Sequence, residues 1–258
     1  MRLSVELEFA QEVRRGLTSS PQKTLPTRYL YDEVGSALFD AITALPEYGL
    51  TNADVRLLTV HSSEIEHLCA GVTDVVELGS GNGTKTRVIL TAFPPAVTYR
   101  PVDISAAALE RCTREMHGFR TIPVEADFLS GLDQVSDRRP TDGHMLTLFL
   151  GSNIGNFNRH EIIPFLTAIR QRLRTGDYFL IGADLIKPAD QLILAYDDPA
   201  GVTAAFNRNL LARVNRQLEG NFHLQSYDHQ ALWNSPDRRI EMHLLARSDQ
   251  NVRLGAID

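Results

Sequence analysis

The chain has 258 residues, 43% of them hydrophobic and 22% charged, as in an ordinary soluble globular protein of one large or two small domains. Its formal net charge of −6 disfavours a nucleic-acid partner, because nucleic-acid-binding surfaces normally carry a basic excess. The two cysteines form no Cys-x-x-Cys pair and the eight histidines show no His-x-x-x-His spacing, so we expect neither a disulfide scaffold nor a metal site. The sequence shows no leader pattern and no apolar run of membrane-spanning length. We therefore expect a cytoplasmic protein without a membrane partner, and favour a monomer.

Three helices are predicted before residue 70, and strands alternate with helices after it. Apolar residues at helical spacing predict helices over 4–17, 33–44 and 52–69. Strands are predicted at 74–79, 97–103, 121–126, 145–151 and 177–184, and helices at 84–93, 105–117 and 159–174. The strand at 145–151 is apolar without alternation, which is typical of a parallel sheet covered on both faces.

The pattern changes after residue 186. Pro188 breaks the chain, 200–218 has the pattern of a long helix, and 221–229, 239–247 and 251–257 alternate like antiparallel strands. We therefore expect an α/β protein in three parts. An N-terminal helical segment at 1–70 would cover the active site, a Rossmann-like core would span 71–187, and 188–258 would form an α+β substrate-binding lobe.

The most informative run is an apolar strand that ends in Glu77-Leu78 and continues into glycines at 79, 81 and 83. Glycine is needed where the backbone turns sharply or approaches a ligand closely, and helical character begins at Thr84, so this is a nucleotide-cofactor turn. The dinucleotide fingerprint Gly-x-Gly-x-x-Gly fails at Thr84, and the Gly-Lys-Ser/Thr end of a phosphate-binding P-loop is absent. The remaining Glu-x-Gly-x-Gly-x-Gly resembles motif I of class I S-adenosylmethionine-dependent methyltransferases. A glycine-rich turn without a ligand has the same pattern.

Polar residues follow the next strands at the edge where parallel sheets bind ligands. Asp103 ends the second strand and is suited to accept hydrogen bonds from ribose hydroxyls. Asp127 ends the third strand and is suited to an adenine amino group, with Phe128 against the base. Lys85 lies in the first turn of the helix after the glycines, where it could pair with a cofactor carboxylate or simply be solvated.

The flanking sequence resembles a more specific family. Four stretches carry the similarity, namely 25–40 (LPTRYLYDEVGSALFD), 45–48 (LPEY), 196–209 (YDDPAGVTAAFNRN) and Trp233-Asn-Ser together with 239–242. They resemble the signature of the histidine-specific Nα-methyltransferases, which make hercynine (histidine trimethylbetaine) in ergothioneine biosynthesis, and the resemblance covers essentially the whole chain. It implies methylation of the α-amino group of histidine, with S-adenosyl-L-methionine as methyl donor, S-adenosyl-L-homocysteine as product and no metal.

The resemblance also implies roles for individual residues at matching positions. Cofactor contacts are implied for Gly79, Lys85, Asp103, Asp127 and Phe128. Substrate contacts are implied for Tyr48, Asn156, Tyr196, Thr203 and Met242, with Asn156 and Tyr196 on the substrate carboxylate. Catalytic positions are implied for Tyr31, close to the reacting amine, and for Gly151. Taken by themselves, Tyr31 and Tyr48 could instead pack the N-terminal helices, and Asn156 could bond its own loop.

Two alternatives stay open. Proteins of the resembled family continue beyond the position of Asp258 with a segment that reads the imidazole, so the lobe at 188–258 is expected to be truncated at its C-terminus. The substrate could therefore be another amino acid, such as tryptophan or a thiolated histidine. The chain could also be a catalytically silent cofactor-binding module.

Overall fold

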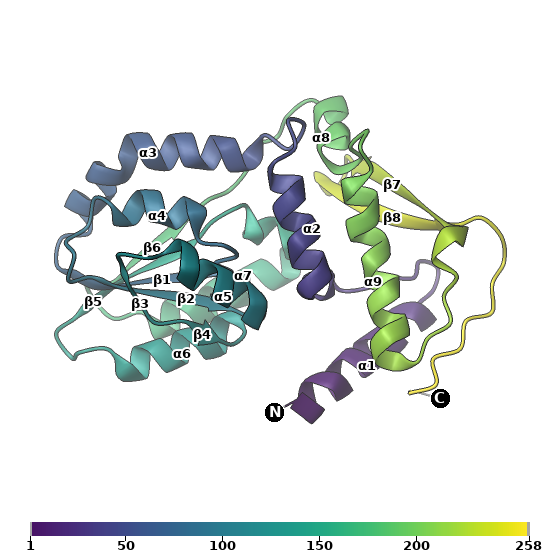
Figure 1. The fold of residues 1–258 in the computed structure, drawn as a ribbon, viewed down its shortest axis with the longest axis horizontal. Coiled ribbons are helices and arrows are strands. Elements are labelled where there is room, and N and C mark those ends of the chain that lie inside the picture. Colours follow the sequence, from purple (N-terminus) through teal and green to yellow (C-terminus); the bar gives the residue numbers. More distant parts are fainter. Residues whose placement is uncertain (1, 257–258) are drawn as a thin grey trace. The chain divides into compact units, whose positions relative to one another are not determined.

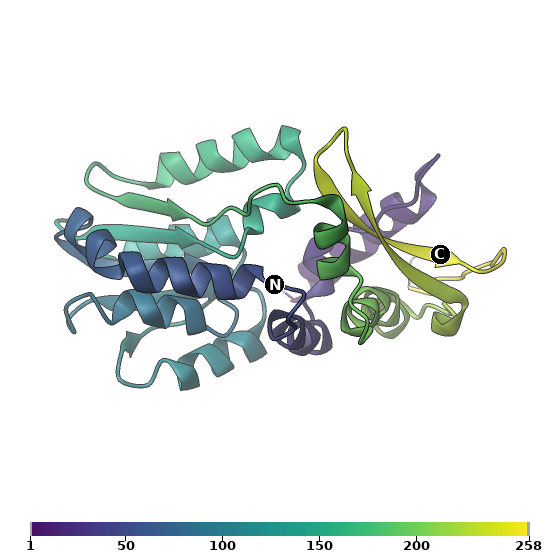
Figure 2. The same ribbon diagram turned by 90° about the horizontal axis from the view of Figure 1, so that it is seen from above.

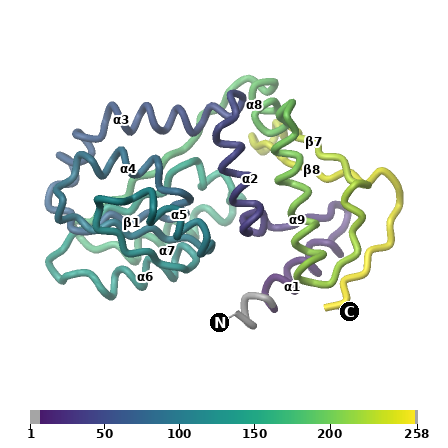
Figure 3. Tube along the Cα trace, in the orientation of Figure 1, coloured from purple at the N-terminus to yellow at the C-terminus, as the bar shows by residue number. Residues whose placement is uncertain are grey.

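The computed structural model describes residues 2–256, with side chains from Leu7 onward. The described chain packs as two compact units (Figures 1 and 3). One unit is Gly49–Leu185, and the other joins the residues up to Tyr48 with those from Ile186 on. No helix within residues 2–256 is long and apolar enough to cross a membrane.

The unit Gly49–Leu185 is a parallel α/β structure. Its strands are β1 (Val72–Leu78), β2 (Thr98–Asp103), β3 (Arg120–Thr121), β4 (Val124–Glu125), β5 (His144–Phe149) and β6 (Tyr178–Ile181). They form one sheet in the order β3-β2-β1-β5-β6, with β4 also paired to β2, and all of these pairings are parallel. Its helices are α3 (Leu50–Leu68), α4 (Thr84–Leu90), α5 (Ala106–Glu115), α6 (Phe128–Arg138), the 3₁₀ turn η2 (Asn153–Asn156) and α7 (Arg159–Arg172).

Successive residues of the strands feed two separate apolar layers. On one face Val75 and Leu146 pack with residues of α3, α4 and α5. On the other face Val76 and Met145 pack with residues of α6 and α7. Helices α3 and α4 lie side by side in both views of the ribbon (Figures 1 and 2). Burial on both faces explains why the strands lack polar alternation, and the parallel pairing places their carboxyl ends at one edge.

The second unit is α+β. It contains α1 (Arg2–Thr18), the 3₁₀ turn η1 (Thr27–Leu30), α2 (Glu33–Thr43), α8 (Ala189–Tyr196), α9 (Val202–Leu218), the 3₁₀ turn η3 (Leu224–Ser226), β7 (Tyr227–Asn234) and β8 (Arg239–Ala246). Strands β7 and β8 form an antiparallel hairpin. Helix α9 buries Phe206, Leu210, Val214 and Leu218, which recur at helical spacing and line one face of the helix.

The predicted α/β fold with a parallel sheet is confirmed, and the structure differs from the prediction in local elements. Helix α6 was not predicted, because its first residues were assigned to a strand end. Pro188 ends the irregular stretch 182–188 and precedes α8, a helix that the sequence did not predict, as its N-cap residue. The first strand of the hairpin begins at Tyr227, and 251–256 contain an isolated bridge at Leu254 instead of a strand. The division into parts at 1–70, 71–187 and 188–258 stays a prediction, and α3 belongs to the compact unit that holds the sheet.

Candidate active site

The glycine loop after β1 follows a backbone path that excludes side chains. Gly79 has φ +76° and Gly81 has φ +53°, in the left-handed region that L-residues rarely adopt. A Cβ on Gly79 would lie 3.0 Å from Asn153 Nδ2 and 3.3 Å from Phe128 Cε1, whereas a Cβ on Gly81 would meet nothing within 4 Å. The loop is thus closely packed against Phe128 and Asn153 at Gly79 and bordered by open space at Gly81.

Asp103 fixes this loop from the neighbouring strand. Its Oδ2 accepts a hydrogen bond from the Gly81 backbone N–H at 3.2 Å, and its Oδ1 accepts one from Ser105 N–H at 2.9 Å. Burial raises the pKa of Asp103 despite these backbone donors. Each carboxylate oxygen retains lone-pair capacity, so the group can still accept from a ligand hydroxyl.

Asp127 is the N-cap residue of α6. Its Oδ1 accepts from the backbone N–H groups of Leu129 and Ser130 at 3.0 Å each, and its Oδ2 accepts from Ser130 Oγ at 2.6 Å. Burial alone would raise the pKa of Asp127, but the Ser130 hydroxyl and these N–H groups outweigh it and hold the pKa low. The carboxylate therefore stays ionised and fixed in orientation at the start of the helix. Phe128 follows it, with its ring against Gly79.

Lys85 and Gly151 meet at a residue that the sequence did not single out. Lys85 Nζ lies 3.3 Å from Asp54 Oδ2, and the same oxygen accepts a hydrogen bond from Gly151 N–H at 3.2 Å. Gly151 has φ +70°, and a Cβ there would lie 2.6 Å from Lys85 Nζ, so a side chain at this position would be strained and would displace the lysine. Asp54 comes from α3, so the helix before the sheet is tied to the loops after β1 and β5.

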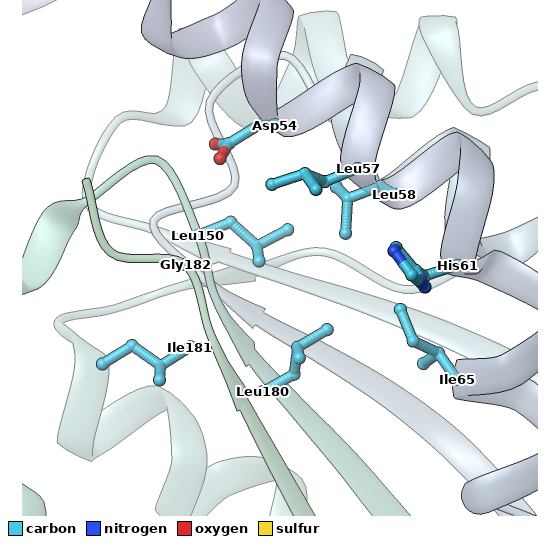
Figure 4. Close-up of a pocket in the computed structure, with 9 residues that line it drawn as sticks. All are labelled: Asp54, Leu57, Leu58, His61, Ile65, Leu150, Leu180, Ile181 and Gly182. Atoms are coloured by element: carbon cyan, nitrogen blue, oxygen red, sulfur yellow. The ribbon is translucent and has the colours of Figure 1, made fainter. Parts of the chain in front are cut away.

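An apolar pocket of about 290 Å³ lies beside this junction (Figure 4). It is lined by residues of α3 and of the ends of β5 and β6, namely Asp54, Leu57, Leu58, His61, Ile65, Leu150, Leu180, Ile181 and Gly182. Asp54 lies toward one end of the pocket and Ile65 toward the other. None of the predicted site residues lines it, so this pocket is separate from the glycine loop.

Three predicted site tyrosines lie in one aromatic cluster of the second unit. The Tyr31 ring packs edge-on against Phe39 and Phe206, with centroid distances of 5.4 and 5.5 Å. Phe39 continues the cluster to Tyr48 at 6.2 Å, and Tyr48 contacts Tyr196 at 6.0 Å. Residues far apart in the sequence are thereby brought together in one aromatic surface, which we call the tyrosine cluster (Tyr31, Phe39, Tyr48, Tyr196 and Phe206).

Polar contacts fix the chain on both sides of this cluster. Asp32 caps α2 by accepting from Gly35 N–H at 2.8 Å, and the same Oδ1 accepts from Asn209 Nδ2 of α9 at 2.7 Å. Asp198 is buried and accepts from the N–H groups of Val202 and Thr203, at 3.0 and 2.7 Å, in the first turn of α9. Tyr31 is thus followed directly, and Tyr196 two residues later, by a carboxylate that is hydrogen-bonded to α9.

The remaining predicted residues are distributed over both units. Thr203 is buried in the first turn of α9, and Met242 is half-buried on β8, paired with Ala231. Asn156 is exposed at the end of η2, in the unit that holds the sheet. The structure thus groups the cofactor candidates around the glycine loop and most substrate candidates around the tyrosine cluster. Within residues 2–256 no group of three or more His, Cys, Asp or Glu side chains is placed to hold a metal ion.

Comparison with known proteins identifies the family. The sequence model described as "Histidine-specific methyltransferase, SAM-dependent" matches residues 9–258. The chain belongs to this family. This histidine-specific methyltransferase sequence is 44% identical, over 98% of the chain and 79% of the relative, to histidine N-alpha-methyltransferase of Mycobacterium tuberculosis. It is also 44% identical, over 96% of the chain and 78% of the relative, to the Mycolicibacterium smegmatis protein of the same name. A third relative is ergothioneine biosynthesis protein 1 of Neurospora crassa, at 32% identity over 83% of the chain and 25% of that protein.

The residues of the glycine loop fit the methyl donor that the family uses. S-adenosylmethionine carries an amino-acid tail and an adenosine but no phosphate. The open backbone at Gly81 and the Cβ-free cradle at Gly79 suit close approach of such a ligand. Lys85 supplies a positive charge beside the loop, and Asp103 supplies hydrogen-bond acceptors at the end of β2. This histidine-specific methyltransferase therefore carries a donor set that matches its cofactor.

Proposed function

We propose that this methyltransferase converts the α-amino group of L-histidine to its trimethylbetaine, hercynine, as the first step of ergothioneine biosynthesis. The observation that carries the proposal is the 44% identity to two histidine N-alpha-methyltransferases over 96–98% of the chain. The relative named for ergothioneine biosynthesis supports the pathway. A cytoplasmic location and a monomeric state stay predictions.

On this proposal Gly79, Lys85, Asp103, Asp127 and Phe128 hold the cofactor. When bound there, S-adenosylmethionine supplies an activated methyl group on a sulfonium. Lys85 would exchange its partner Asp54 for the carboxylate of the amino-acid tail, or bind both. Asp103 would accept from the ribose, and the ionised Asp127 would accept from the adenine amino group while Phe128 lies against the base.

The tyrosine cluster would hold the amino-acid substrate together with Asn156, Thr203 and Met242. Tyr196 and Asn156 would donate to the substrate carboxylate, and Tyr48 would contact the substrate beside them. Tyr31 would lie near the amine, with Gly151 as the second catalytic position. Aromatic faces stabilise a methylated ammonium through cation–π attraction, so a surface of this composition tolerates the growing positive head group.

Methyl transfer requires that the protein align the amine with the methyl group and that one proton leave the amine before each transfer. The pKa of the α-amino group of a free amino acid lies above the value of about 8 for a peptide N-terminus, because the neighbouring carboxylate stabilises the ammonium, so the lone pair must be freed before it can attack the methyl group. The Tyr31 hydroxyl or a water molecule would relay this proton away from the amine before each transfer. Holding amine and methyl in line supplies the remaining rate, with effective molarities of roughly 10⁵ M or more.

The proposal is tested by mass spectrometry of a panel of amino acids incubated with the protein and S-adenosylmethionine. Histidine should give mono-, di- and trimethylated products. Conversion of tryptophan or a thiolated histidine with no histidine product would refute the substrate. If calorimetry showed heat of S-adenosylhomocysteine binding but no amino acid were methylated, the protein would be a catalytically silent cofactor-binding module. Absence of binding heat would refute the cofactor site.

Single-residue variants test the assigned roles. Tyr196→Phe and Asn156→Ala should raise the KM for histidine by about tenfold, since each removes a hydrogen bond to a charged group. The affinity for S-adenosylhomocysteine should be unchanged in both. Tyr227→Phe removes a hydroxyl from the unit of Tyr196 but outside the tyrosine cluster, and it serves as the matched control for Tyr196→Phe. Histidine KM values that do not differ from this control would contradict the carboxylate role.

A further inference from the structure

A buried imidazole lies behind Tyr196. His229 is on β7, and its side chain is 1% exposed. Its Nε2 lies 2.8 Å from the backbone carbonyl oxygen of Tyr196, and its Nδ1 lies 3.0 Å from Nδ2 of Asn207 on α9. The Asn207 side chain also contacts the His243 carbonyl oxygen, at 3.1 Å from the same Nδ2. Four groups from α8, α9, β7 and β8 thus form one hydrogen-bonded chain.

The two backbone carbonyl oxygens that end this series of hydrogen bonds, those of His243 and Tyr196, determine where its protons lie. A backbone carbonyl can only accept, so the atom of Asn207 that faces His243 must be the NH₂ group. That NH₂ has two protons, and the second points to His229 Nδ1, which must therefore be unprotonated. Nε2 then carries the ring proton and donates it to the carbonyl of Tyr196. Asn207 selects one neutral tautomer of His229.

The accepting carbonyl lies at the carboxyl end of α8. Tyr196 is the last residue of α8, and the last four carbonyls of an α-helix lack intrahelical donors. His229 therefore acts as a side-chain cap on the end of α8, an arrangement known for histidine at helix C-termini. Directly after this cap, Asp198 anchors the first turn of α9, so the segment from Tyr196 to Thr203 is held at both ends.

We infer that His229, fixed by Asn207 as the Nε2–H tautomer, is a positioning residue that sets the backbone of Tyr196 and thereby the placement of its ring in the tyrosine cluster. The inference rests on the proposed function in so far as Tyr196 binds the substrate carboxylate. Neither His229 nor Asn207 touches the substrate in this account. Their effect reaches the site through the main chain of Tyr196, whose ring lies 6.0 Å from that of Tyr48.

Three variants separate positioning from mere packing. His229→Phe keeps a ring of similar size but removes the donor, and it should raise the KM for histidine about tenfold with little change in kcat or in the KM for S-adenosylmethionine. His229→Gln keeps an N–H donor in reach of the Tyr196 carbonyl and should recover the histidine KM to within about threefold of wild type. His223→Phe makes the same ring exchange at an exposed histidine of the same unit and should leave both KM values unchanged. A His229→Phe protein with wild-type KM for histidine would overturn the inference.

A spectroscopic measurement tests the inference without turnover. ¹⁵N shifts of the imidazoles in protein labelled at histidine distinguish a protonated Nε2 from a protonated Nδ1. We expect His229 to carry its ring proton at Nε2 and not at Nδ1, and to lose this preference in Asn207→Leu. The aromatic resonances of Tyr196 should shift in His229→Phe and stay in place in His223→Phe. A ring protonated at Nδ1, or unmoved Tyr196 resonances, would overturn the inference, whereas wild-type protein that does not methylate histidine would refute the proposed function alone.

Discussion

Replacing Gly79 with alanine tests whether the glycine loop is shaped for a ligand. Gly79 combines a φ of +76° with close neighbours on the side where a Cβ would lie. Asn153 Nδ2 would be 3.0 Å and Phe128 Cε1 3.3 Å from the added atom, so both side chains would have to give way. Phe128 is also the residue proposed to lie against the adenine. The change should therefore disturb both the stability of the loop and the affinity for the cofactor.

The magnitude follows from two separate costs. An L-residue in the left-handed region costs about 1–2 kcal/mol, and the loss of unfolded-state freedom on replacing glycine returns about 0.4–1 kcal/mol. Forcing a methyl group into a packed site adds about 1–3 kcal/mol. Gly79→Ala should thus lower the free energy of unfolding by about 1–5 kcal/mol, with a central value of about 3 kcal/mol. A displacement of Phe128 that removes about 1.4 kcal/mol of binding would weaken S-adenosylhomocysteine tenfold.

Gly118→Ala provides the matched control. Gly118 has a φ of +90°, and a Cβ there would meet nothing within 4 Å, so the substitution carries the backbone cost without the steric one. Urea unfolding should show a loss of about 1 kcal/mol for Gly118→Ala, and calorimetry should show unchanged binding of S-adenosylhomocysteine. If Gly79→Ala matched this control in both stability and affinity, the close packing at Gly79 would have no functional meaning.

Three further predictions concern buried groups of the same unit. Arg139→Met should lower the free energy of unfolding by about 3–5 kcal/mol, because Arg139 and Asp177 form a two-pronged ion pair, at 2.5 and 2.7 Å, with both side chains fully buried. Arg172→Met, at the more exposed pair with Asp133, should cost less than about 1 kcal/mol in the same urea titration, and equal losses would contradict the reasoning. Burial alone would raise the pKa of Asp177, but Arg139 and two backbone N–H groups hold it below its usual range. The pair's contribution should therefore be complete above about pH 4 and be lost as the pH falls through the lower folded pKa, so wild type should lose more stability than Arg139→Met between about pH 5 and pH 2. Burial raises the pKa of Cys112 to about 12, so a thiol-specific reagent at about pH 8 should modify it only on unfolding, and rapid labelling of the native protein would disprove this.

The parallel sheet could be predicted because each strand carries its own signal, whereas α6 depends on tertiary packing. Gly131 lies inside α6, where glycine is unfavourable by about 1 kcal/mol relative to alanine. The structure explains its presence, since a Cβ at Gly131 would lie 2.3 Å from Val102 Cγ1 of β2. Close approach of helix and strand thus outweighs the local preference. The capping signal at Asp127 was present in the sequence but was interpreted as the end of a strand that binds a ligand.

In the candidate site too, some residues could be predicted from their neighbours in the sequence, and others depend on contacts between distant parts of the chain. Asp103, Lys85 and the glycines follow from the position of residue types after strands, which a sequence displays directly. Asp54 could not be found in this way, because it lies within a helix and reaches Lys85 and Gly151 only through the packing of α3 on the sheet unit. The residues next to His229 in the sequence do not indicate its role either, since its partners Tyr196 and Asn207 lie 33 and 22 residues before it.

The two longest signature stretches are connected physically as well as by resemblance. Asp32 from 25–40 and Asn209 from 196–209 are hydrogen-bonded at 2.7 Å, and Arg216 of α9 reaches the other oxygen of Asp32 at 2.5 Å. Tyr31 and Tyr196 are carried by these same stretches, so much of the signature specifies the frame that presents the tyrosine cluster and not the contacts to one amino acid. On the proposed function, a relative that keeps this frame could act on a different amine, because an aromatic cluster would recognise a methylated ammonium by its charge and size. It follows that resemblance in these stretches supports α-amino methylation more strongly than it supports histidine, and that the choice of side chain must be tested on the substrate itself.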